Sequence, residues 1–145
     1  MKEHLSAWLL AVVVTFVVGS IAQSQFVLAG LEQIGVAISY SSRFYTTLND
    51  LVGLLPGYGT VIAIGFLPAF GFAGWIRKKL QTGLWVFPLA GFVTILTIFA
   101  AMYPIFEVTL VAGARSTAGL VCQCLSGALG GVVFTTVNRR IKGEV

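Results

Sequence analysis

Charged residues are scarce in this sequence. Asp, Glu, Lys and Arg make up 10% of the 145 residues, whereas 57% are apolar and the mean hydropathy is +0.95. A soluble domain usually carries about 25% charged residues, and a chain so poor in charge cannot cover a globular surface with polar groups. In lipid the requirement reverses, because unpaired polar groups are costly there. The composition therefore indicates a single integral membrane domain over residues 1–145.

Histidine and cysteine are also rare. His4 lies in the N-terminal tail, so no zinc site, bis-histidine haem site or Ser-His-Asp set is available. Cys122 and Cys124 stand two apart on an apolar helix, where their side chains diverge and cannot share a metal or a disulfide. No P-loop or dinucleotide fingerprint is present. We therefore expect no metal and no cofactor, and the balance is against an enzyme without excluding one.

Four apolar segments are long enough to cross a bilayer, which takes about 20 helical residues. They cover approximately residues 5–22, 53–76, 83–103 and 117–137, and none contains a charged residue. The fold class predicted is an all-α membrane protein, a four-transmembrane-helix bundle with short interfacial helices in the first outer loop. The first segment also resembles a signal peptide ending at Ser20-Ile21-Ala22, although Glu3 argues against cleavage.

The basic residues predict the orientation. Seven of nine flank three ends of the apolar segments: Lys2, Arg77, Lys78, Lys79, Arg139, Arg140 and Lys142. The positive-inside rule then places both termini in the cytoplasm of a multi-pass plasma (inner) membrane protein. Such clusters do not form the basic face of a nucleic-acid binder. The aromatic belts agree, with Trp8, Trp75 and Trp85 near the inner interface and Tyr40, Tyr45, Tyr58 and Tyr103 near the outer one.

Residues 23–50 form a long outer segment between the first two spans. Apolar residues from Phe44 to Val52 recur at helical spacing, after Ser41 or Ser42 as an N-cap, and Arg43, Thr47 and Asp50 fall on the opposite face. We expect one or two short helices that lie at the interface or cover the bundle. Such a cover serves either to shield the bundle or to close over a site.

Small residues are abundant, with 17 glycines in the chain. At spacings of three or four on a helix they let two backbones approach closely. The helix-packing candidates are Gly71, Gly74, Ser126, Gly127, Gly130 and Gly131. Their contacts serve either the bundle itself or an oligomer, and the sequence favours neither.

The remaining polar residues gather on the outer side. Arg43, Asp50, Glu107 and Arg115 are the candidate ligand-binding residues, and Ser116 or Thr117 could cap the last helix. This cluster serves either to tie the outer cover to the helix ends or to hold a polar head group. No ionisable residue lies deep in a span, unlike the usual arrangement in ion-coupled transporters.

The leading functional hypothesis is a non-catalytic accessory or structural subunit, or a homo-oligomer, assembled through Gly-rich helix packing. Its partners would be membrane lipids and further copies or other membrane subunits, with no nucleic acid. The alternative is binding of a lipid, quinone or other amphiphile, or catalysis on it, at the outer cluster. An oligomeric channel or transporter ranks third.

Overall fold

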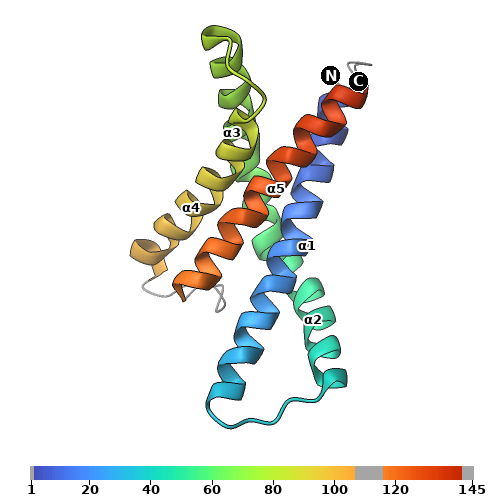
Figure 1. The fold of residues 1–145 in the computed structure, drawn as a ribbon, viewed down its shortest axis with the longest axis vertical. Helices are drawn as coiled ribbons and strands as arrows, with labels where there is room; N and C mark the ends of the chain where they lie inside the picture. Colours follow the sequence, from blue (N-terminus) through green and yellow to red (C-terminus); the bar gives the residue numbers. More distant parts are fainter. Residues whose placement is uncertain (1, 107–115, 142–145) are drawn as a thin grey trace.

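The computed structural model describes residues 2–106 and 116–141, and over these residues the chain is helical with short connections (Figure 1). The helices are α1 Lys2–Gln33, α2 Tyr40–Leu54, α3 Thr60–Leu80, α4 Val86–Phe106 and α5 Thr117–Ile141, with a π-helical turn η1 at Leu55–Gly59. Within the described residues, three helices are long and apolar enough to cross a membrane, namely His4–Gln33, Tyr40–Leu80 and Thr117–Ile141. A shorter apolar helix covers Val86–Ala101. These lengths and compositions suggest a membrane protein.

Helix α1 does not end near residue 22, where the first span was expected to stop. It continues to Gln33, so residues 23–33 extend this helix and form no separate cover element. No Pro interrupts residues 23–33, their one charged residue, Glu32, stands next to the end of the helix, and Gly30 by itself does not stop a helix. At about 1.5 Å per residue, 32 residues span about 48 Å, more than a hydrocarbon core of about 30 Å.

Helix α2 begins two to three residues earlier along the chain than the predicted caps imply. Its N-cap is Ser39, whose hydroxyl accepts from the Ser42 N–H, so neither Ser41 nor Ser42 is the cap. The helix then runs through η1 into α3, giving a continuous helical segment from Tyr40 to Leu80. The π-helical turn contains Pro56, which has no N–H to donate and therefore disturbs the regular ladder.

The last two helices keep close to the expected boundaries. Helix α4 continues past the expected end at residue 103 to Phe106. Helix α5 begins at Thr117, as expected, and Ser116 caps it by accepting from the Gly119 N–H at 3.0 Å. Capping by Ser116 thus agrees with one of the two predicted caps.

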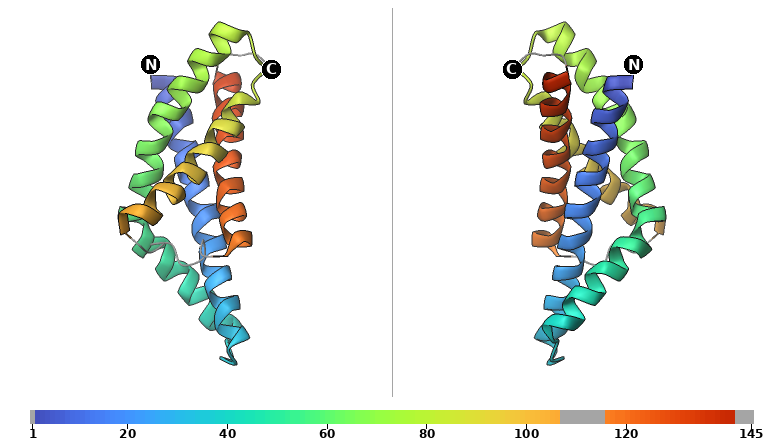
Figure 2. Two further views of the ribbon diagram at one scale, coloured as in Figure 1. Left: turned by 90° about the vertical axis from the view of Figure 1, so that its left-hand side faces the viewer. Right: turned by 90° about the vertical axis from the view of Figure 1, so that its right-hand side faces the viewer.

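Both termini and the α3–α4 connection lie at one end of the molecule, and the α1–α2 connection lies at the other (Figures 1 and 2). The first end carries Arg77, Lys78, Lys79, Arg139 and Arg140, and we call it the basic end. The second is the hairpin end, where α2 folds back along the last part of α1.

Helix α5 packs against α1 on one side and α4 on the other, and small residues permit both approaches. A Cβ on Gly127 would meet the Gly91 carbonyl, and one on Gly131 would meet the Phe87 carbonyl, both on α4. A Cβ on Gly130 would meet Thr15 of α1. Aromatic side chains fill the space toward α3, chiefly Phe66, Phe70, Phe87 and Phe134.

Candidate functional site

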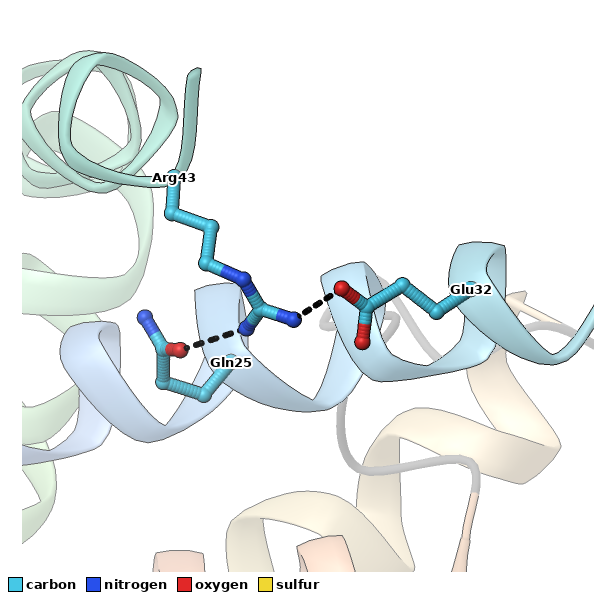
Figure 3. Close-up of polar contacts among 3 residues, drawn as sticks. All are labelled: Gln25, Glu32 and Arg43. Carbon is cyan, nitrogen blue, oxygen red and sulfur yellow. Dashed lines mark hydrogen bonds and ion pairs between the residues drawn. The ribbon is translucent and has the colours of Figure 1, made fainter. Parts of the chain in front are cut away.

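The outer polar cluster expected from the sequence is divided into separate contacts. Arg43 of α2 forms an ion pair with Glu32 near the end of α1, and its Nη1 donates to Gln25 Oε1 at 3.2 Å (Figure 3). The side chains of Arg43 and Glu32 remain 26% and 42% exposed. Partly exposed pairs of this kind contribute at most about 1 kcal/mol to stability. Their role in this geometry is to hold α2 against α1.

Asp50 does not join that ion pair. Its Oδ2 accepts from Ser24 Oγ at 2.6 Å, two turns of α2 away from Arg43. The structure therefore places Arg43 and Asp50 in different contacts along the α1–α2 interface. Glu107 and Arg115, the other two candidates, lie outside the described residues.

The polar side chains of α2 are turned toward α1, and most of its large apolar side chains point outward, whereas Leu51 and Leu54 pack against the core. Thr47 accepts from Gln25 Nε2 at 3.4 Å, which adds a third polar contact to those of Arg43 and Asp50. The large apolar side chains of the opposite face are 49–92% exposed, and they follow one another at spacings of three or four: Tyr40, Phe44, Leu48, Val52 and Leu55. We call these five residues the outer stripe.

A buried polar network joins α1, η1 and α5. Tyr58 Oη donates to Gln123 Oε1 at 2.7 Å, and Gln123 Nε2 donates to the Gly19 carbonyl at 3.0 Å. Tyr58 is 4% exposed, so it does not belong to the outer aromatic belt to which its position in the sequence assigned it. One turn further along α5, Thr15 Oγ1 donates to the Ser126 carbonyl at 3.3 Å. Each donor and acceptor in these contacts is paired, which suits a role in helix packing.

A cavity of about 1020 Å³ opens at the basic end between α1, α3, α4 and α5. Its walls are mainly apolar and aromatic, and Arg77, Lys78 and Arg139 lie among its lining residues. His4 also lines it, because the residue belongs to the first turn of α1 and not to a free tail. Sequence reasoning did not find this cavity. The sequence does contain a pattern that could have indicated the cavity. Basic residues and tryptophans lie close to Gly71 and Gly74 at the same ends of the helices.

The candidate packing glycines therefore have two different surroundings. Gly127, Gly130 and Gly131 face neighbouring helices closely, and Ser126 is fully buried beside α1. Gly71 and Gly74 have open space where a Cβ would project, and both line the cavity.

The described residues offer few groups for covalent or redox chemistry. Cys122 and Cys124 are free, Cys124 is buried, and no group of three His, Cys, Asp or Glu residues in 2–106 and 116–141 could hold a metal ion. What the geometry provides is an apolar chamber with a basic rim and an exposed apolar stripe. Searches of protein-family models, of curated protein sequences and of solved structures found no match to this chain.

Proposed function

We propose that this chain is a non-catalytic membrane protein that acts by associating with other membrane subunits or with further copies of itself. The observation that carries the proposal is the outer stripe of α2. An amphipathic helix normally buries its apolar face and exposes its polar face. In α2 the polar side chains form hydrogen bonds with α1, whereas the outer stripe is exposed and available for another contact.

The arrangement in the bilayer is part of this proposal. Helix α4 has 21 residues and lies along α5, which supports its serving as a fourth span. The shared location of the basic residues supports a cytoplasmic basic end in a plasma membrane. The hairpin end would then lie on the outer side.

The position of Tyr40 and Phe44, the first two residues of the stripe, favours a protein over lipid tails as their neighbour. If the hydrocarbon core covers about 20 residues of α1 from Leu5 onward, it ends near Ser24. Arg43 of α2 packs beside Gln25 and Glu32, beyond that level. Tyr40 and Phe44 are 92% and 69% exposed there. Large apolar patches outside lipid mark interaction surfaces.

Assembly through the small residues of α5, as expected from the sequence, draws less support. Gly127, Gly130 and Gly131 already approach α4 and α1 of the same chain. The proposed contact with other subunits is therefore made by the outer stripe and not by the glycines of α5.

The test is native mass spectrometry of the protein extracted gently from its own membranes. The double variant Tyr40→Ala/Phe44→Ala should lose at least half of the associated subunits or copies, because aromatic anchors dominate such contacts. Phe72→Ala is the matched control, since Phe72 is 66% exposed but lies on α3. A complex that survives the double variant, or a wild-type protein found only as a monomer, would contradict the proposal.

The alternative, an amphiphile site at the outer cluster, is less well supported by the geometry. Arg43 and Asp50 each have a partner of their own, and neither lines the basic-end cavity. Retained amphiphile binding in an Arg115→Ala variant would count against Arg115, one of the two remaining candidates of that cluster.

A further inference from the structure

The walls of the basic-end cavity are suited to an apolar chain. Trp8 of α1, Leu67 and Phe70 of α3, Phe87 of α4 and Phe134 of α5 all line it. Its volume of about 1020 Å³ is at the upper end of the range for ligand pockets, about 300–1,000 Å³. Pockets of this kind bind small molecules by burying apolar surface and orient them with a few polar groups.

The rim of the cavity is positive. Arg77 and Lys78, at the end of α3, and Arg139, near the end of α5, are exposed and line the same opening. Among the lining residues there is no Asp or Glu. Basic pockets between spanning helices attract anionic head groups, because a positive potential favours a negative charge there.

Two donors beside the cavity have no partner among the described residues. Trp8 Nε1 and Thr82 Oγ1 are both buried atoms without a hydrogen bond, and both residues line the cavity. A buried donor left unpaired costs about 1–3 kcal/mol. An acceptor on a bound ligand would remove that cost, and this points to a molecule with oxygen atoms at its head.

Part of the cavity wall formed by α3 consists of glycines, which have no side chain to narrow the cavity. Gly71 and Gly74 of α3 line the cavity, and a Cβ at either position would have no neighbour within 4 Å. In a spanning helix, this wall leaves room for a chain to enter from the surrounding lipid.

We propose that this cavity binds an anionic amphiphile, with its negative head at Arg77 and Lys78 and its apolar chain between the aromatic walls. The head is a phosphate or a carboxylate, as in an anionic phospholipid or a free fatty acid. The site lies at the opposite end from the outer cluster and does not depend on the assembly proposed above.

Filling the cavity is the first test. Purified protein is mixed with phosphatidylglycerol, oleate or phosphatidylcholine, and retained ligand is counted by native mass spectrometry. Gly71→Leu should reduce retention of the anionic ligand at least tenfold, because the new side chain projects where the chain lies. Gly53→Leu is the matched control: Gly53 has equally open space but lies on α2, outside the cavity.

The charges give a second test that does not depend on a bulky substitution. Arg77→Gln and Lys78→Gln should each weaken retention about fivefold, as expected for about one charge contact to an anionic head. Lys79→Gln removes the same charge from the next residue, whose Nζ lies 4.9 Å from the Trp75 ring centre and which does not line the cavity. Arg77→Lys should restore most of the affinity lost in Arg77→Gln.

The pattern among the three probes identifies the ligand. Retention of phosphatidylglycerol without oleate assigns the site to a phospholipid, and the reverse assigns it to a fatty acid. Equal retention of phosphatidylcholine and both anionic probes, or retention unchanged by Gly71→Leu and by the loss of Arg77 and Lys78, overturns the proposal. If Gly71→Leu fails to fold, the two charge variants and their Lys79→Gln control decide.

Discussion

Gln123 lies deep in the bundle, and its side-chain amide is hydrogen-bonded at both ends, to Tyr58 and to the Gly19 carbonyl. Polar residues at such depth are informative, because an unpaired amide there cannot form a hydrogen bond with water. In the sequence, Gln123 is one of the few polar residues of its mainly apolar span. The sequence could not identify Tyr58 as the partner, because a tyrosine close to Pro56 and Gly57 is equally typical of the membrane interface.

Removing either partner should lower the free energy of unfolding by different amounts. Tyr58→Phe removes one hydrogen bond and should cost about 0.6 kcal/mol, the average for such contacts in a membrane protein. Gln123→Leu leaves the buried Tyr58 hydroxyl without its acceptor and should cost about 1–3 kcal/mol. The measurement is reversible unfolding in mixed SDS micelles, completed as a double-mutant cycle. Tyr45→Phe, at a tyrosine that is 69% exposed, should change nothing. Zero coupling in the cycle would contradict the structural role given to this contact.

At the scale of elements, the α4–α5 contact depends on the absence of side chains. Gly91 and Gly127 face each other so closely that a Cβ on either would meet the other's backbone. Backbone cannot move aside as a flexible side chain can, so the two helices would have to separate. The sequence predicted close packing at Gly127 from its spacing to Gly131. It could not name α4 as the neighbour, because spacing on one helix does not identify the helix that packs against it.

Alanine substitutions should therefore affect the free energy of unfolding differently at glycines that face another helix and at glycines that face open space. Gly127→Ala should lower the free energy of unfolding by about 1–3 kcal/mol through overpacking. Gly74→Ala should leave it unchanged or raise it by up to about 1 kcal/mol, because its site is open and Ala is the better helix former. Both variants are compared by the same SDS titration. Equal effects at the two positions would show that the α4–α5 approach is looser than described.

Over the whole molecule, the basic residues of α3 and α5 lie with the chain ends at one end, and the α1–α2 hairpin projects at the other (Figure 2). The sequence predicted helices from apolar runs, and the structure has a helix over most of each of the four predicted segments. The sequence analysis underestimated the length of α1, which ends at Gln33 and not near residue 22. The outer segment is therefore divided between the end of α1 and the helix α2. The extension of α1 contacts α2 through Ser24, Gln25 and Glu32, and contacts of this kind cannot be seen in local hydropathy.

The proposed orientation can be measured with single cysteines introduced after Cys122 and Cys124 are replaced by Ala. Val36→Cys, in the α1–α2 connection, should react with a membrane-impermeant maleimide on intact cells. Leu80→Cys, at the end of α3, should react only after the membrane is opened. Both positions are exposed, at 46% and 65%, so accessibility within the protein does not separate them. The reverse pattern would place the basic end outside and contradict the topology.

The sequence by itself determined that this chain is helical, rich in apolar segments and basic at three of their flanks, because hydropathy and charge are properties of local composition. Only the tertiary structure decided how the polar residues are used. It turned the polar face of α2 toward α1, paired Arg43 with Glu32, and left Asp50 to Ser24. It also gathered residues from four helices around the basic-end cavity. Such groupings depend on which helices pack together and at what depth, and residues distant in the sequence carry no local record of that choice.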